Sequence, residues 1–504
     1  MNITNVSQAN GKDSVSTLNF TKDQHKAYDE LISFINAPYN ASDFKRALTG
    51  PAGTGKTYLV KALIKNCNLS YSQIGLAAPT HKACRILEES IGISNVKTFT
   101  LASALGFRLN FDLDNFDPSN PPFDKKGKIK IENCKLIIID EASMINDTHI
   151  EYICGKPKRI KGGVKTFLED VCKTKQCKLI YLGDTHQLCP VNETDIPVFK
   201  TTKSYKLTQI VRQEEDNPVK YLLSLLRYDI EHKTFNFLQH ISKVKEQFDE
   251  FNTKGYKVCN PKEFGEIVAI NFNDEELTHN VDFAKVIGYT NICVSSWNKF
   301  IRNSIIQDAE KSVITKNDLI ISYTTIVNQF NEVVIANSEE YILQDVVNYV
   351  HPTYELKGFL VRFIAIHGGK VTTPLFVLDH KDNFTISKYV QISDSMINAA
   401  KSSSVKLRAQ KWRDYYTFKE SCLLLTNIAN PITGSIVYSR DLDYGFSLTA
   451  HKSQGSTFDT ALVDVNDIVY NKYGQPYTDA EEINRRLYVA CSRCKSKLYL
   501  KFGN

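Results

Sequence analysis

The sequence predicts an α/β protein built on parallel β-sheets. Three apolar runs, Ile74–Ala78, Leu136–Asp140 and Leu179–Gly183, each have the composition of a strand that is buried on both faces. Segments with helical periodicity separate these runs between residues 19 and 200, which is the alternation expected of βαβ units. We therefore expect a first parallel-sheet module over residues 19–200.

A second module of the same kind follows, and an insertion interrupts it. Its expected strands include Val286–Thr290 and Ala461–Val465. Between them, residues 328–436 begin with short strand-like runs and then become helix-like. We expect the second module to consist of residues 201–327 and 437–504, with an inserted domain at 328–436.

The first module contains an insertion of its own, and a polar tail precedes it. Residues 107–131 place the turn-rich cluster Asp117–Pro122 between two short strand-like runs, which predicts a β-hairpin. Residues 1–18 are rich in Asn, Ser and Thr and lack the apolar segment of a signal peptide. This segment is expected to form a flexible N-terminal tail.

Composition excludes some classes and leaves others open. The 504 residues carry a net charge of +6, which is too small to predict nucleic-acid binding by itself. No run of about 18 apolar residues occurs, so no membrane span is expected. The twelve cysteines include one C-x-x-C pair, Cys491 and Cys494, without a second pair, and we therefore expect no structural zinc site.

A phosphate-binding P-loop is the most specific motif of the chain. It matches G-x-x-x-x-G-K-[ST] and consists of Gly50, Pro51, Ala52, Gly53, Thr54, Gly55, Lys56 and Thr57. Its glycines allow backbone N–H groups to surround phosphates, and the lysine adds a positive charge. It follows a strand-like stretch, 44–49, and begins a helix whose N-terminus favours an anion.

Two carboxylates follow the next buried strand. Ligands of parallel sheets bind at the carboxyl ends of the strands, where Asp140 and Glu141 lie. Asp140 and Thr57 can hold Mg²⁺, and Glu141 can orient or deprotonate an attacking water. Together with the P-loop, this pair predicts an ATP or GTP hydrolase.

Three further residues suit such a site but are weak signals when taken singly. Gln187 follows a third strand, in Gly183–Leu188, where it can sense the γ-phosphate. Arg212 and Arg493 lie outside the first module, from which arginines that stabilise a transferred phosphoryl group often come. A surface salt bridge is the alternative for either arginine alone.

Taken together and in order, these stretches resemble the motifs of superfamily 1 helicases. Within that superfamily the chain is most similar to the RecD-like 5′→3′ branch (superfamily 1B) and, in size and layout, to the Dda-like helicases of phages. The matching stretches are Phe20–Gln24 (Q motif), Gly50–Thr57 (I), Asp140–Ser143 (II), Gly183–Leu188 (III), Leu207–Gln213 (IV), Thr449–Thr457 (V) and Tyr488–Arg493 (VI).

The resemblance implies two RecA-like domains in tandem, with a pin-like hairpin and an SH3-like and helical domain as insertions. It assigns an ATPase site between the two RecA-like domains to Lys56, Thr57, Asp140, Glu141, Gln187, Arg212 and Arg493. It also assigns Gln24 to adenine recognition and Gly455 to nucleotide binding. ATP and Mg²⁺ are the implied cofactors.

The resemblance also implies a path for a single strand across both domains. The implied contacts are Pro79, Thr80, His81, Lys82, Thr98, Thr100, Thr290, Asn291, Thr449, His451 and Lys452. Hydroxyls, amides and cations suit phosphates and carry no base specificity. In the pin, Phe107, Phe111, Phe116 and Phe123 are candidates for a wedge that separates the duplex, and the sequence does not choose among them.

The helical part of the inserted domain leaves two interpretations open. It mixes basic and aromatic residues, namely Lys406, Arg408, Lys411, Trp412, Arg413, Tyr415 and Tyr416. Such a mixture can contact a strand or a partner. An amphipathic helix with a solvated basic face is the alternative.

The expected function is that of an ATP-dependent 5′→3′ DNA helicase acting in phage DNA replication, recombination or repair. An RNA helicase and a nucleic-acid-stimulated ATPase that acts as a clamp or translocase are the alternatives. The expected partners are single-stranded DNA, forked duplex DNA, and single-strand-binding or replisome proteins. We expect a monomer in the cytoplasm, which is that of the bacterial host if the origin is a phage.

Overall fold

The computed structural model describes residues 19–503, except 110–122, 125–127, 154–155, 191–192, 210–216, 275–279, 308, 328–332 and 367. The chain forms two compact units. The first comprises residues up to Pro79 together with Ala83–Gly106 and Lys128–Glu214. The second comprises Glu215–Asn504 and two short segments, Thr80–Lys82 and Phe107–Gly127.

A six-stranded, wholly parallel sheet forms the centre of the first unit. Its strand order is β10-β1-β9-β6-β2-β3. The strands are β1 (Lys45–Thr49), β2 (Ile74–Ala78), β3 (Lys97–Thr100), β6 (Leu136–Ile139), β9 (Lys178–Gly183) and β10 (Ser204–Lys206). The three strands predicted from apolar runs and the strand-like stretch 44–49 are present within one residue at either end, because their side chains are buried on both faces of the sheet.

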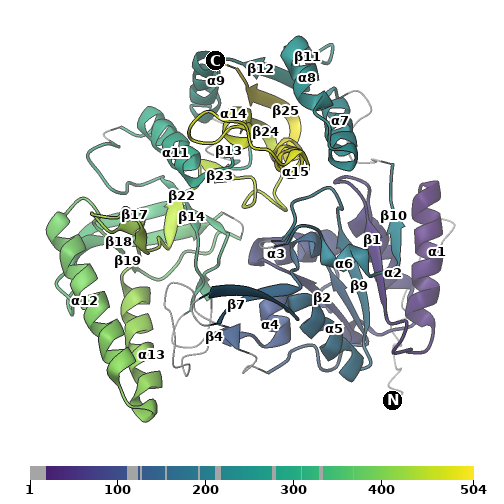
Figure 1. Cartoon of the computed structure of the whole chain (residues 1–504), viewed down its shortest axis with the longest axis horizontal. Coiled ribbons are helices and arrows are strands. Elements are labelled where there is room, and N and C mark those ends of the chain that lie inside the picture. Colours follow the sequence, from purple (N-terminus) through teal and green to yellow (C-terminus); the bar gives the residue numbers. More distant parts are fainter. Residues whose placement is uncertain are drawn as a thin grey trace, which may run out of the picture. The chain divides into compact units, whose positions relative to one another are not determined.

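Helices cover both faces of this sheet. The helices of the unit are α1 (Lys22–Asn36), α2 (Lys56–Asn66), α3 (His81–Ile91), α4 (Leu101–Leu105), α5 (Val164–Thr174) and α6 (Pro197–Lys200). Leu31, Leu63 and Leu87, from α1, α2 and α3, share one buried cluster with Ile138 and Ile180 of the sheet. On the opposite face, Glu169 of α5 accepts a hydrogen bond from the Tyr181 hydroxyl (3.2 Å). Figure 1 shows α1 and α2 side by side next to this sheet.

The second unit contains a second RecA-like sheet with the order β11-β12-β25-β24-β13-β23. All its neighbouring strands are parallel except β11 and β12. The strands are β11 (Glu246–Phe248), β12 (Gly255–Cys259), β13 (Ala284–Gly288), β23 (Ser447–Thr449), β24 (Phe458–Asp464) and β25 (Cys494–Lys501). The helices are α7 (Val219–His232), α8 (Asn236–Lys243), α9 (Pro261–Phe272), α11 (Asn291–Ile305), α14 (Val465–Val469) and α15 (Ala480–Cys491). The fold class predicted from the sequence is therefore confirmed.

An antiparallel sheet is inserted between β13 and β23. It has the order β19-β18-β17-β14-β22, with β14 (Leu319–Ser322), β17 (Glu340–Val350), β18 (Lys357–Ala365), β19 (Leu375–Leu378) and β22 (Leu442–Tyr444). The sheet thus uses residues on either side of the expected 328–436. Two short antiparallel pairs accompany it, β15 (Ile326–Val327) with β16 (Val333–Ile335) and β20 (Ile428–Ala429) with β21 (Ile436–Tyr438).

A helical pair, α12 (Asn383–Ser402) and α13 (Val405–Ser421), belongs to the same insertion. Trp412 and Tyr415 of α13 are almost fully buried, and they pack with Ala400, Met396 and Ile397 of α12. Lys411 and Arg413 are exposed. Trp412 and Tyr415 of this mixed segment are therefore core, which favours the amphipathic-helix interpretation.

Two hairpin-like pairs lie outside these sheets. In the predicted pin, β4 (Arg108–Leu109) pairs antiparallel with β5 (Phe123–Asp124). Phe111 and Phe116 lie outside the described residues, so the choice of a wedge stays open. A second hairpin, β7 (Thr148–Ile153) with β8 (Lys156–Lys161), was not predicted.

Within the described residues, no helix combines the length and the apolar character that crossing a membrane requires.

Candidate functional site

The P-loop connects β1 to α2 at the carboxyl end of the first sheet. Gly55 has a left-handed backbone (φ 78°), and a Cβ there would lie 2.5 Å from Nε2 of Gln24. A Cβ on Gly50 would lie 2.6 Å from the Leu207 carbonyl oxygen. The glycines of the motif are thus required both by conformation and by close packing around the loop.

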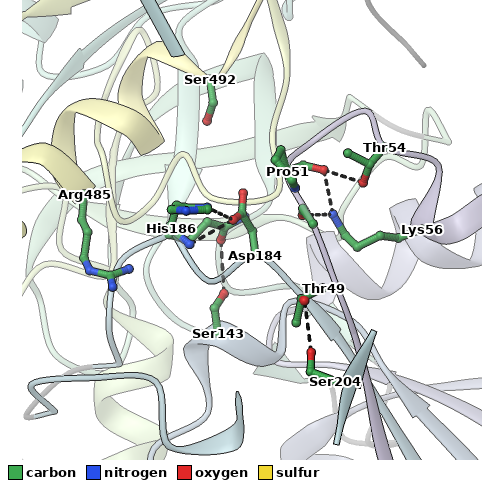
Figure 2. Close-up of polar contacts among 12 residues, drawn as sticks. Thr49, Pro51, Thr54, Lys56, Ser143, Asp184, His186, Ser204, Arg485 and Ser492 are labelled. Carbon is green, nitrogen blue, oxygen red and sulfur yellow. Dashed lines mark hydrogen bonds and ion pairs between the residues drawn. The ribbon is translucent and has the colours of Figure 1, made fainter. Parts of the chain in front are cut away.

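Lys56 and Gln24 hold this loop in shape. The Lys56 ammonium donates to the carbonyl oxygens of Gly50 (2.6 Å) and Pro51 (3.0 Å), and Figure 2 shows the side chain folded back toward the loop. Nε2 of Gln24 donates to the Thr54 carbonyl (2.9 Å), and Oε1 of Gln24 accepts from the Thr21 N–H (2.9 Å). Gln24 therefore supports the P-loop directly, and its predicted contact with adenine stays a prediction.

Asp140 and Glu141 follow β6 as expected. One oxygen of Asp140 accepts the Glu141 N–H (2.9 Å), and desolvation inside the protein raises the pKa of Asp140, although the charge of Lys56 opposes that rise. Glu141 has a left-handed backbone (φ 50°), which is uncommon for a residue with a side chain. Such strain is often found at functional positions, where the surrounding structure maintains it.

Asp184, at the end of β9, is a third carboxylate of this site that sequence reasoning missed. It is buried, and its Oδ1 accepts the His186 N–H (2.9 Å) and lies 3.2 Å from Nδ1 of His186 (Figure 2). Burial alone would raise the pKa of Asp184, but the bonds from His186 and the charge of Lys56 hold it below the usual value. The signal for it was present, since Asp184 ends an apolar run as Asp140 does.

Gln187 lies in the same corner of the first unit. The Ser143 hydroxyl donates to its side-chain oxygen (3.2 Å), which links the segment after β6 to the segment after β9. β6 and β9 are neighbours in the sheet, and β9 pairs with β1, the strand that precedes the P-loop. The sheet therefore brings Lys56, Asp140, Glu141 and Gln187 to one edge, with Asp184 and Ser143 added.

The two predicted arginines have different outcomes. Arg212 lies outside the described residues. Arg493 lies just after α15 in the second unit, where it is buried and donates to the carbonyls of Val489 (2.9 Å) and Ser456 (3.2 Å). The bond from Arg493 to Ser456 joins motif VI directly to motif V. Ser456 follows Gly455, whose backbone is left-handed (φ 77°). The catalytic role of Arg493 stays a prediction.

The strand contacts predicted for the first sheet lie at the ends of β2 and β3. Pro79 follows β2 and is partly buried, as is Thr98 of β3. The buried Thr98 hydroxyl has no hydrogen-bond partner in the part of the chain that the structure describes. Thr100 instead caps α4 by accepting the Ser103 N–H (3.2 Å).

The segment Thr80–Lys82 groups with the second unit. Thr80 and His81 are partly buried, and burial lowers the pKa of His81. Lys82 is buried, and its ammonium lies 2.9 Å from a carboxylate oxygen of Glu340. Its positive charge is thus paired within the protein, and its predicted contact with a strand stays a prediction.

The remaining predicted contacts lie on the second RecA-like sheet. Thr290 caps α11, and its hydroxyl also donates to Asp467 (2.6 Å), whereas Asn291 and His451 are exposed. The Thr449 hydroxyl accepts the Lys452 N–H (3.3 Å). A cavity of about 1270 Å³ opens beside α9 and α11, with Thr290 among its lining residues.

Comparisons with known proteins agree with this geometry. The AAA domain family matches residues 22–249, which contain the P-loop, Asp140, Glu141 and Gln187. RecD2, an ATP-dependent DNA helicase of Deinococcus radiodurans, is 30% identical over 34% of this chain and 20% of its own length. The ATP-dependent DNA helicase Dda of phage T4 is 30% identical over 33% of this chain and 34% of its own length. These matches support a superfamily 1B helicase.

The similarity to these two helicases is confined to a part of each. A third relative, the uncharacterised protein R530 of Acanthamoeba polyphaga mimivirus, is similar along nearly the whole chain. It is 23% identical over 95% of this chain and 99% of its own length. R530 is thus similar along nearly its whole length, whereas RecD2 and Dda each match about a third of this chain.

Proposed function

We propose that this ATP-dependent helicase moves 5′→3′ along single-stranded DNA and unwinds duplex DNA. One observation carries the proposal. In the first sheet, the residues predicted for the nucleotide follow β1, β6 and β9. Those predicted for the strand follow β2 or lie in β3, and β2 adjoins β6. Nucleotide and strand would therefore bind at neighbouring positions on one edge, where a change at one can be transmitted to the other.

The chemistry of the donors suits MgATP. Thr57, in the first turn of α2, and Asp140 offer the oxygen ligands that Mg²⁺ prefers. A divalent cation would also favour the ionised form of Asp140, which burial disfavours. When bound, Mg²⁺ neutralises charge on the phosphates. Lys56 would leave the loop carbonyls to bind the phosphates, and Glu141 and Gln187 would orient the attacking water.

The relatives favour DNA as the substrate, since RecD2 and Dda are both described as DNA helicases. The direction of movement is proposed from the resemblance to the RecD-like branch. A role in phage DNA replication, recombination or repair stays a prediction, as do the expected protein partners, the monomeric state and the cytoplasmic location.

Two duplexes that differ only in the polarity of their tail test the proposal. We expect the protein with MgATP to unwind DNA with a 5′ single-stranded tail and to leave DNA with a 3′ tail intact, with Lys56→Ala inactive on both. Unwinding from the 3′ tail alone would reject the direction. ATPase activity that DNA stimulates without unwinding would favour a translocase or clamp, and stimulation by RNA alone would favour an RNA helicase.

A further inference from the structure

A tyrosine ring in the second unit lies against two cations. Tyr323 directly follows β14, and Arg440 shortly precedes β22, the neighbouring strand of the inserted sheet. The centre of the Arg440 guanidinium lies 4.7 Å from the centroid of the Tyr323 ring. The Lys452 ammonium, from the motif V segment of the RecA-like sheet, lies 3.5 Å from the same centroid. We call these three residues the cation platform.

The cation platform connects two of the predicted strand contacts. Nη2 of Arg440 donates to the side-chain oxygen of Asn291 (3.3 Å) and to the Tyr323 hydroxyl (3.1 Å). Asn291 begins α11, whose N-terminal N–H groups favour an anion. Asn291 and Lys452 are thus joined through Arg440 and Tyr323, two residues that the sequence did not single out.

The charges of the platform do not balance. Asp443 forms an ion pair with Arg440 (2.8 Å), but within the described residues no carboxylate lies within ion-pair distance of Lys452. Burial, reinforced by the nearby charge of Arg440, lowers the pKa of Lys452 to about 8. Two cations and one carboxylate leave a net positive charge in a partly desolvated position, where an anion would be bound favourably.

We propose that Arg440 and Tyr323 are strand-binding residues, and that with Lys452 they hold a backbone phosphate of the single strand. The inference rests on the proposed function, and it adds the inserted domain to the strand-binding surface. The Tyr323 ring keeps both cations in place without neutralising either of them, as cation–π contacts do. The ligand is therefore a phosphodiester, and the platform reads no base sequence.

Salt-dependent binding tests this proposal with matched variants. Anisotropy of a labelled oligothymidylate gives the dissociation constant over a series of salt concentrations. Arg440→Gln is expected to weaken binding about tenfold and to reduce the slope of log K against log salt by about 0.7, the value for one lost phosphate contact. Tyr323→Leu should weaken binding similarly, because Lys452 loses its support. Tyr323→Phe keeps the ring and loses only the bond from Arg440, so it should weaken binding less.

Arg362→Gln is the matched control. Arg362 lies in β18 of the same inserted sheet, exposed and paired with Asp345 (2.7 Å), so its loss removes the same charge away from the platform. If Arg440→Gln behaves like Arg362→Gln, the platform is only a structural contact and the inference is wrong. If the wild type binds no single strand at all, the proposed function itself fails, and the inference fails with it.

Proton uptake gives a second measurement that folding defects do not imitate. A bound phosphate should raise the pKa of Lys452, so the wild type should take up protons on binding the oligonucleotide at pH 8. The groups facing Lys452 are Tyr323, Arg440 and Asp443 of the inserted sheet, with His451 beside it. Calorimetry in two buffers of different ionisation enthalpy measures the uptake, and a wild type that takes up none would overturn the assignment of Lys452 to a phosphate.

Discussion

Glu141 and Lys56 are both predicted to act on ATP, but substituting them should have different effects on ATP binding and hydrolysis. Glu141→Gln keeps the shape of the side chain and removes the base, so ATP should still bind while hydrolysis falls by about 10²–10⁴. Lys56→Ala removes the charge that meets the phosphates and should abolish turnover. Binding of a fluorescent ATP analogue and strand-stimulated ATPase activity measure the two effects, with Lys65→Ala on the same helix as the control. Normal hydrolysis by Glu141→Gln would mean that another group positions the water.

Glu340 makes a residue-scale prediction about stability. It is buried and accepts hydrogen bonds from Lys285 (2.6 Å) and Lys82 (2.9 Å). Burial would raise its pKa, but the two ammonium groups lower it from 4.5 to about 2. A carboxyl with a depressed pKa contributes stability above its unfolded pKa, and this contribution is lost as the pH falls toward its folded pKa. Glu340→Gln should therefore cost about 3–5 kcal/mol of unfolding free energy at pH 7.

The pH dependence separates this effect from a packing defect. The difference between wild type and Glu340→Gln should narrow by about 1.4 kcal/mol for each pH unit below about 4.5. Both tryptophans, Trp297 and Trp412, belong to the second unit, so tryptophan fluorescence during urea unfolding follows that unit. Glu355→Gln, which breaks an exposed pair with Lys388, should show no comparable loss. A difference that does not change with pH would contradict the charge-based account.

At the scale of secondary-structure elements, the sequence predicted those strands that are buried on both faces and missed an element that is not apolar. Strands such as Leu136–Ile139 are buried on both faces, so their sequences are continuous apolar runs that end where the site begins. The β7–β8 hairpin was missed because its second strand, Lys156–Lys161, is mostly basic and has no such run. In α13, the sequence shows aromatic and basic residues side by side, and only the packing against α12 shows that Trp412 belongs to the core.

The position of a residue relative to the buried strands also decides whether the sequence can point to it as a candidate site residue. Lys56, Asp140 and Gln187 each lie shortly after a strand of one parallel sheet. The strand pattern of the sequence therefore places all three at the same edge of that sheet. Arg440 and Tyr323 meet through a pairing of β14 with β22, which are more than a hundred residues apart, and no local pattern announces that contact. The ion pair of Lys82 with Glu340 is equally non-local. Motifs therefore point to the residues predicted for the nucleotide, whereas contacts such as these two emerge only from the fold.

At the scale of the whole molecule, ATP hydrolysis should need both units although the P-loop lies in the first. Arg493 belongs to the second unit, where its guanidinium donates hydrogen bonds to the carbonyls of Val489 and Ser456. These bonds hold the guanidinium in a fixed position, as suits an arginine that stabilises a phosphoryl group during transfer. Arg493→Ala should leave ATP binding intact and lower the strand-stimulated hydrolysis rate by about 10³ or more.

The control for this change is Arg413→Ala, which removes an exposed arginine of α13 that hydrogen-bonds to Gln410. ATP binding, measured with the same fluorescent analogue, should be unchanged in both variants, because the P-loop lies in the other unit. Arg493→Lys keeps the charge but loses the planar fork, so it should recover only part of the rate. If Arg493→Ala hydrolyses ATP as fast as Arg413→Ala, then the first unit is sufficient for hydrolysis. Movement along the strand would then not depend on motif VI, because the charge of Arg493 would be unnecessary for ATP hydrolysis.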